Sequence, residues 1–248
     1  MSITTITSAN KLTEAYTEVQ RDGYTKLAAV FSPDEVASML TAIEAALQDA
    51  DPAIRGEEGT VYAARNILQL WPEVATAWRR PPLPEILSRL LGPCFGLVRV
   101  LYFDKPPGQS WALPWHKDLT IAVRDNTFPN AEFRRPTRKA GVPHVEASQD
   151  VLEEMLTARI HLDAVTAENG PMKVVAGSHR AGKALVLDAG EVRTLYAGAG
   201  DVLLIRPLVA HCSNRSIDGT ERHRRILHLE FAASPRLPDG FAWHDFVP

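Results

Sequence analysis

The change of pattern at Gly92 constrains the fold of this 248-residue chain more than any other feature. After Gly92 come six short runs rich in β-forming residues, many of them bounded by Gly and Pro turns: 95–103, 155–162, 172–175, 184–187, 202–205 and 226–231. Many short strands divided by turn residues are typical of a β-sandwich or a closed barrel, and the jelly roll is one such form. We therefore expect a mainly β protein with a double-stranded β-helix, or jelly-roll, core over 93–248.

Helices are expected before this point, over 1–92. Ser32-Pro33-Asp34-Glu35 predicts a helix start, because it places a serine cap, a proline at the first helical position and a glutamate three residues after the cap. Apolar residues follow at helical spacing: Val36, Met39, Leu40, Ile43 and Leu47. We expect an earlier helix over 12–21 and a later one from about residue 84 that stops at Gly92.

The segment 124–149 has weak periodicity, several prolines and many charges, which favours a long surface loop. Because it directly follows one of the metal-binding motifs described below, it is a candidate lid that closes over the substrate and excludes water. The chain shows no internal repeat and no long linker, so we expect a single domain over 1–248.

Composition excludes several classes of protein. With 45% hydrophobic and 23% charged residues the chain resembles ordinary globular proteins, and a net charge of −3 does not suggest a nucleic-acid partner. The first six residues do not form a secretory signal, and no apolar run reaches the roughly 18–20 residues that cross a bilayer. Cys94 and Cys212 form no spacing motif, so we expect free thiols and a cytoplasmic protein. The pattern does not predict an oligomeric state.

His116, Asp118 and His211 form the most informative constellation. Two histidines and one carboxylate can hold a metal on one face and leave the other face open, as in non-haem Fe(II) oxygenases. The Arg224-Arg225 pair downstream could clamp a dicarboxylate co-substrate through two parallel hydrogen bonds. The pattern therefore predicts an oxygenase that uses Fe(II), 2-oxoglutarate and O₂.

Two similar motifs compete with this assignment, and their context decides against them. His116 follows a loop that enters a new strand and His211 closes the run 202–205, so both are expected at the rim of the β core. His161 and Asp163 instead lie within a strand and share a face with Arg159, which predicts a polar network inside the sandwich.

The second competing motif is His228-Leu229-Glu230. For this pair we expect packing at a strand end or exposure to solvent rather than a metal site.

The chain resembles the phytanoyl-CoA dioxygenase family over about residues 24–231. The matching pieces are short but occur in a specific order: Asp22-Gly23-Tyr24, Phe31-Ser32-Pro33-Asp34-Glu35, Lys105-Pro106-Pro107-Gly108, Pro114-Trp115-His116-Lys117-Asp118, Glu168-Asn169-Gly170-Pro171, Gly177-Ser178-His179, His211-Cys212-Ser213 and Arg224-Arg225-Ile226-Leu227. The resemblance implies a jelly roll wrapped by amino-terminal helices and Fe(II) held by His116, Asp118 and His211. It also implies that 2-oxoglutarate contacts Arg224, Ser213 and the residue at Leu101.

Two positions depart from the family pattern. Lys117 replaces a glutamine that usually separates the first two ligands, and Arg159 stands where an aromatic residue often lines the pocket. The loop after His211 is about two residues longer than usual in the family, so Arg222, Arg224 and Arg225 compete for the 2-oxoglutarate clamp. Counting along the last strand favours Arg224.

The resulting expectation is a dioxygenase that hydroxylates a small polar or anionic metabolite and releases succinate and CO₂. Asp118 argues against a halogenase, because related halogenases leave that position small for chloride. The candidate substrate contacts are Arg159, Asn66 and His144. The alternatives are a zinc-dependent hydrolase on a similar scaffold and a jelly-roll protein that binds metal without turnover.

Overall fold

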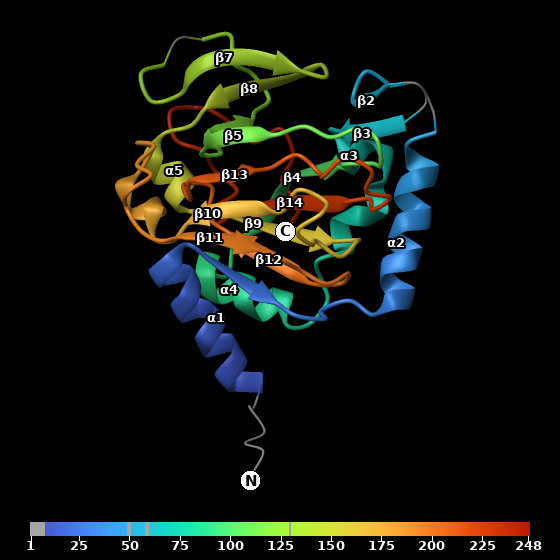
Figure 1. The fold of residues 1–248 in the computed structure, drawn as a ribbon. Coiled ribbons are helices and arrows are strands. Elements are labelled where there is room, and N and C mark those ends of the chain that lie inside the picture. Colours follow the sequence, from blue (N-terminus) through green and yellow to red (C-terminus); the bar gives the residue numbers. More distant parts are fainter. Residues whose placement is uncertain (1–7, 49–50, 58–59, 129) are drawn as a thin grey trace.

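Two facing antiparallel sheets build the protein (Figure 1). The structure, a computed structural model, describes residues 8–48, 51–57, 60–128 and 130–248. In the larger sheet the strand order is β1-β12-β9-β14-β4-β3-β2, and in the smaller sheet it is β11-β10-β13-β5. The prediction of a mainly β, jelly-roll core is confirmed.

The bounds of the strands show where the sequence patterns succeeded. The larger sheet consists of β1 (Tyr24–Leu27), β2 (Ile54–Glu57), β3 (Thr60–Ala64), β4 (Gly96–Phe103), β9 (Met155–His161), β12 (Val202–Ile205) and β14 (Ile226–Ala232). The smaller sheet consists of β5 (Leu113–His116), β10 (Met172–Val175), β11 (Val192–Leu195) and β13 (His211–Ser213). Five of the six expected runs form strands, and 172–175 and 202–205 match to the residue.

The amino-terminal helices pack on the outer face of the larger sheet, and all three expected helices are present. The helical elements are α1 (Ser8–Asp22), α2 (Pro33–Ala46), α3 (Ile67–Leu70), η1 (Pro72–Thr76), α4 (Leu83–Leu91), α5 (Gln149–Glu153) and η2 (Ser178–Ala181). The amino-terminal third is not purely helical, however, because β1, β2 and β3 extend the larger sheet at both edges. Residues 1–7 of the expected helical region lie outside the described residues. No helix within the described part of the chain combines the length and apolar character needed to cross a membrane.

Alternation along the central strands separates the hydrophobic core from the interior of the jelly roll. On β14, Leu227, Leu229 and Phe231 belong to the core cluster shared with α1, α2 and α4. The intervening residues His228 and Glu230 point to the opposite face, since successive strand residues alternate. Strands β4 and β9 follow the same pattern, so one face of the sheet builds the core and the other lines a cavity.

The expected strand over 184–187 is wrong. This segment contains bends and no regular structure, and the side chains of Leu185 and Leu187 are 49% and 41% exposed. The edge strand β11 instead begins at Val192 and pairs with β10. Residues 184–187 have no partner strand, and β-forming residues adopt a strand only where cross-strand packing rewards them.

The expected long loop over 124–149 is also wrong. It contains a hairpin of β7 (Arg134–Lys139) and β8 (Val142–Glu146), which joins β6 (Thr120–Ala122) in a third sheet. The two turn residues Ala140 and Gly141 have φ of 48° and 79°, the positive values that a tight hairpin turn requires. Alanine is unusual there, and β7 carries a proline and mostly exposed charged residues, so the sequence pattern did not indicate the hairpin.

The capping box of α2 provides a test of this fold. Ser32 Oγ accepts a hydrogen bond from the Glu35 backbone N–H, and the Glu35 side chain accepts one from the Ser32 N–H. We expect Ser32→Ala to lower the free energy of unfolding by about 1 kcal/mol, because it removes the Oγ acceptor of the Glu35 N–H while the backbone N–H of residue 32 still bonds to Glu35. Urea denaturation measures this change. Ser38→Ala, on the exposed face of the same helix, is the control and should not destabilise the protein.

Candidate active site

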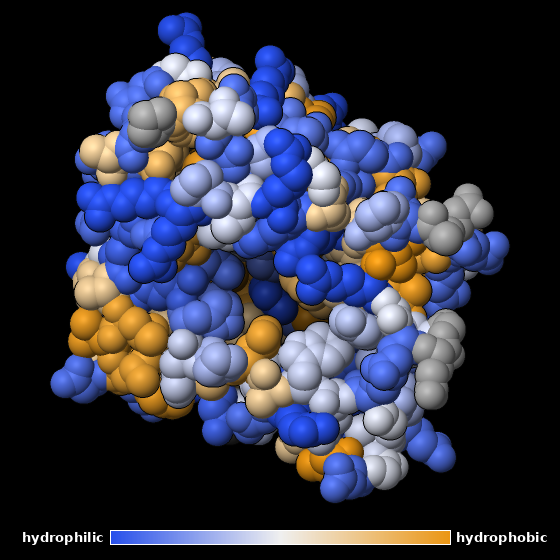
Figure 2. Space-filling view, turned by 90° about the horizontal axis from the view of Figure 1, so that it is seen from above, coloured by the Kyte–Doolittle hydropathy of each residue, from blue (hydrophilic) through white to orange (hydrophobic). Residues whose placement is uncertain are grey.

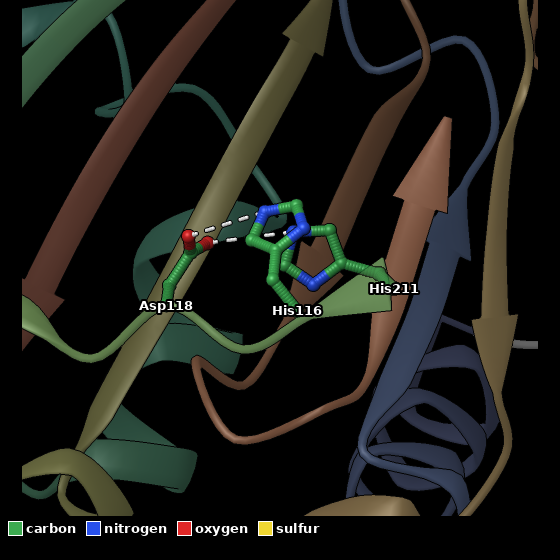
Figure 3. A group of neighbouring side chains, drawn as sticks. All are labelled: His116, Asp118 and His211. Carbon is green, nitrogen blue, oxygen red and sulfur yellow. Dashed lines mark ion pairs between the residues drawn. The ribbon is translucent and has the colours of Figure 1, made fainter. Parts of the chain in front are cut away.

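One cross-strand pair brings the two histidines together. In the antiparallel pairing of β13 with β5, His211 lies directly opposite His116, and their ring centroids are 4.3 Å apart. Asp118 follows β5 and points at both rings (Figure 3). Its carboxylate oxygens lie 3.9 Å from His116 Nε2 and 3.7 Å from His211 Nε2. One potential ligand atom from each of the three residues lies within 4.8 Å of the others, so the set can hold one metal ion.

Backbone carbonyls orient both imidazoles. His116 Nδ1 lies 2.7 Å from the Pro114 carbonyl oxygen and His211 Nδ1 lies 2.9 Å from that of Val209. A carbonyl only accepts, so each Nδ1 carries the proton and each Nε2 keeps its lone pair toward Asp118. The Asp118 backbone N–H in turn donates to the Pro207 carbonyl at 3.0 Å. These bonds preset the ligand geometry. His116 ends β5, where we had expected it at the entry to a strand, and His211 begins the separate strand β13 instead of closing the run 202–205.

The charge states of these groups suit a metal site. Burial alone would raise the pKa of Asp118, but His211, His228, His116 and Arg159 together lower it to about 2. Burial lowers the pKa of His211 to about 4, although Asp118 opposes that shift. At neutral pH the site therefore presents a carboxylate and a neutral imidazole, which are the forms that bind metals.

Lys117, between the first two ligands, points away from them. Its Nζ donates to the carbonyls of Ser178 and Gly182 at 2.9 and 2.6 Å, and the side chain is buried. Lys117 therefore ties the metal-binding loop to the η2 region, and its departure from the family pattern leaves the ligand set intact.

The three residues open into a cavity of about 380 Å³ inside the jelly roll. Figure 2 looks onto the face that carries β7 and β8 and shows it hollowed at the centre, with many hydrophilic side chains around the hollow. Six basic residues line the cavity: Arg55, Arg65, Arg99, Lys139, Arg159 and Arg224. Its acidic lining residues are Asp118 and Glu230. The described lining is thus strongly basic.

The structure distinguishes the three competing arginines. Arg224 is buried and lines the cavity, whereas Arg222 is on the surface and pairs with Glu168. Arg225 pairs with Asp163. Arg224 Nη1 donates to the Gly170 carbonyl, but its Nε is buried and has no hydrogen-bond partner among the described residues. Burial, with Arg159 nearby, lowers the pKa of Arg224 to about 9, so it remains a cation at neutral pH.

Ser213 and Leu101 both line the cavity beside Arg224. Lys105, the first residue of the Lys105-Pro106-Pro107-Gly108 motif, had no predicted role in the site. It is completely buried and donates to Ser213 Oγ at 3.1 Å and to the Asn214 carbonyl at 2.5 Å. The lysine therefore occupies an acceptor site of the Ser213 hydroxyl and leaves its O–H free to donate. Burial, followed by Arg224 and Arg159, lowers the pKa of Lys105 to about 7.

A hydrogen-bonded chain forms one wall of the cavity. Arg159 Nη1 lies 3.1 Å from His228 Nδ1, and His228 Nε2 lies 3.1 Å from Glu230 Oε1. Glu230 also receives two bonds from Arg99, at 2.6 and 2.8 Å. The expectation that His228 and Glu230 lie at a strand end or in solvent is wrong, since both are only 4% exposed. Arg159 has no ion-pair partner among the described residues, so its charge is available to a ligand.

The other substrate candidates lie elsewhere. Asn66 donates to the Ala140 carbonyl and His144 contacts the Val142 carbonyl. Both line a separate small cavity rather than the one at the metal site. The expected network of His161 and Asp163 does not form either, because Asp163 pairs with Arg225 and the described residues offer His161 no hydrogen bond.

Comparison with known proteins identifies the family. The model of the phytanoyl-CoA dioxygenase (PhyH) family matches residues 19–223. The chain belongs to this family. The family consists of Fe(II)- and 2-oxoglutarate-dependent oxygenases, and the cluster of His116, Asp118 and His211 fits their cofactor set of iron and 2-oxoglutarate.

The proteins that are similar to this chain are named for different reactions. An L-proline trans-4-hydroxylase from Streptomyces griseoviridis is 28% identical over 69% of this chain, which spans 56% of that protein's length. EctD from S. alaskensis with bound Fe has a TM-score of 0.64 at 21% identity, over 94% of this chain and 79% of its own. The epimerase SnoN in complex with Fe³⁺, α-ketoglutarate and nogalamycin RO has a TM-score of 0.65 at 17% identity, over 94% and 92%. The two structures share the fold.

Replacement of His211 tests the metal centre. We expect His211→Ala to abolish tight Fe(II) binding, because only His116 and Asp118 of the set would remain. Anaerobic equilibrium dialysis against Fe(II) measures this loss. His161→Ala removes a buried histidine outside the cluster and should keep one Fe(II) per chain. Retained binding in His211→Ala with loss in His161→Ala would overturn the ligand assignment.

Proposed function

We propose that this protein is a dioxygenase that hydroxylates a small anionic metabolite, with release of succinate and CO₂. His116, Asp118 and His211 hold Fe(II) in this proposal, and their convergence is the observation that carries it. The donor set fits the metal, because imidazole and carboxylate on one face are the ligands of non-haem Fe(II) oxygenases.

Arg224 and Ser213 hold 2-oxoglutarate in the proposal. The unpartnered Nε of Arg224 supports this role, since a buried donor without an acceptor is costly and a carboxylate would satisfy it. The Ser213 hydroxyl, fixed by Lys105, offers a second donor, and Leu101 supplies an apolar wall. The residues present therefore fit a dicarboxylate.

Iron and 2-oxoglutarate together supply oxidative decarboxylation coupled to oxidation of a substrate C–H bond. The protein contributes position and charge. Asp118 occupies the carboxylate position, which favours hydroxylation over halogenation. Lys117 and the Pro207 carbonyl hold the backbone around Asp118 in place.

Arg159 supports an anionic substrate. It lines the metal cavity, it is buried, and it forms no ion pair within the described residues, although its charge helps to lower the pKa of Asp118, which is assigned to the metal. Glu230 does not pair with Arg159, because Arg99 already holds both of its oxygens. Arg65 and Lys139 add positive charge to the cavity lining, and the pKa of Lys139 is lowered by burial and then by the charge of Arg65. An anion would relieve this repulsion.

The hairpin β7–β8 is proposed as the lid, in place of a loop. Lys139, at the end of β7, is the hairpin residue among the cavity lining. A hairpin can close as one body over the cavity and exclude water.

Succinate formation from 2-oxoglutarate and Fe(II), with and without a library of metabolites, tests the function. A zinc hydrolase or a binding protein without turnover would release no succinate. If succinate forms only when one class of metabolite is present, the assay also identifies the class of the substrate.

Arg224→Ala should raise the 2-oxoglutarate requirement by orders of magnitude. Loss of one partner from a buried charged pair costs about 2–5 kcal/mol, and about 1.4 kcal/mol corresponds to a tenfold change. The measurement is the KM for 2-oxoglutarate in the succinate assay. Arg222→Ala, on the surface, is the control and should behave as the unaltered protein. A larger effect from Arg222 or Arg225 would show that the clamp was assigned to the wrong arginine.

The substrate's charge can be tested with pairs of acids and their neutral amides. The unaltered protein should prefer the acid by at least about tenfold in kcat/KM, since charged hydrogen bonds contribute about 1.5–3 kcal/mol. Arg159→Met should remove most of this preference while succinate is still formed. A preferred substrate that is wholly apolar and uncharged would disprove the anionic class and leave the iron assignment intact.

A further inference from the structure

A second cavity of about 320 Å³ lies beyond Arg159 and Arg224, on the side away from the metal ligands. Strands β9 and β12 of the larger sheet and β10 and β11 of the smaller sheet contribute to it. Its lining includes none of His116, Asp118 and His211. The volume is at the lower end of the range for small-molecule sites, about 300–1,000 Å³.

Buried donors without partners gather on the walls of this cavity. Five buried side-chain atoms within the described residues have no hydrogen-bond partner, and three of them belong to residues that line it: Arg159 Nε, His161 Nδ1 and Arg224 Nε. The three side chains are 8%, 6% and 4% exposed. Such groups normally carry a partner. Because 2-oxoglutarate is proposed to satisfy Arg224 Nε, the atoms that still lack a partner are Arg159 Nε and His161 Nδ1, and their place beside the cavity indicates a second ligand.

The lining also indicates the ligand's chemistry. Arg159 and Arg224 are cations, and Lys26 lies at the edge, paired with Asp201 at 3.7 Å. None of the described residues that line the cavity is acidic. The remaining wall is largely apolar, with Leu203 as one of several aliphatic side chains. This combination suits one carboxylate attached to a short apolar body.

We propose that this second cavity binds a small carboxylic acid, separately from the 2-oxoglutarate pocket. The carboxylate accepts hydrogen bonds from His161 and from Arg159. Because the two arginines line both cavities, occupancy of one changes the affinity of the other by a finite factor, and linkage makes that factor equal in both directions.

Calorimetric titration with butyrate tests the site, using the full chain loaded anaerobically with Fe(II) and 2-oxoglutarate. We expect one butyrate per chain, and binding of the neutral isostere butanamide at least about tenfold weaker, since hydrogen bonds to a charged group are the stronger ones. Loss of the His161 donor in His161→Leu should weaken butyrate about tenfold, while the Kd for 2-oxoglutarate changes less than threefold.

Two further variants keep the test decisive. His179→Leu removes a histidine whose Nδ1 is also unpartnered but which lines neither cavity, and it should bind butyrate normally. Thr194→Trp fills the cavity from the half-buried edge strand β11 and should abolish butyrate binding even if His161→Leu does not fold.

Several outcomes would overturn the proposal. Absence of butyrate binding, equal binding of butanamide, or normal binding in Thr194→Trp would each do so. If rising butyrate increases the apparent Kd for 2-oxoglutarate without limit, the two compete for one site, and the cavity is only an extension of the co-substrate pocket. A finite plateau supports two coupled sites.

Discussion

The register between β5 and β13 is the constraint on which the site depends. It sets His116 opposite His211, and the backbone bond from Asp118 to Pro207 then brings the carboxylate to both rings. Because side chains alternate along a strand, a slip of one residue would turn one histidine to the other face. Pairing of β13 with β10 on its other side resists such a slip. The ligand set is thus a product of sheet topology more than of any local motif.

The larger sheet separates an apolar environment on its outer face from a polar environment on its inner face. Its outer face packs against helices through an apolar core, and its inner face carries Arg99, Arg159, His228 and Glu230. Burial of so many polar groups is tolerable because most of them bond to one another. The exceptions are the unpartnered nitrogens of Arg159, Arg224 and His161, and these are the positions where ligands are proposed.

Sequence patterns predicted what depends on local periodicity. The helices, the strands at 172–175 and 202–205 and the convergence of His116, Asp118 and His211 followed from spacing and motif order. The β7–β8 hairpin was missed because its Ala140-Gly141 turn lacks the usual signature. His228 and Glu230 were placed wrongly, although the same alternation that favoured Arg224 would have put them on its face. The position of Asn66 and His144 depends on tertiary contacts with no sequence signal.

The hydrogen bonds that join Arg159, His228, Glu230 and Arg99 along the cavity wall have fixed donors and acceptors. An arginine can only donate, so Arg159 makes His228 Nδ1 an acceptor and Arg99 leaves Glu230 accepting from both sides. A hydrogen-bonded chain conducts protons only if every member can both donate and accept. With guanidinium groups at both ends, this row of hydrogen bonds cannot conduct protons. It holds the orientation of the cavity wall but offers no route by which protons from bulk water could reach the reacting atoms.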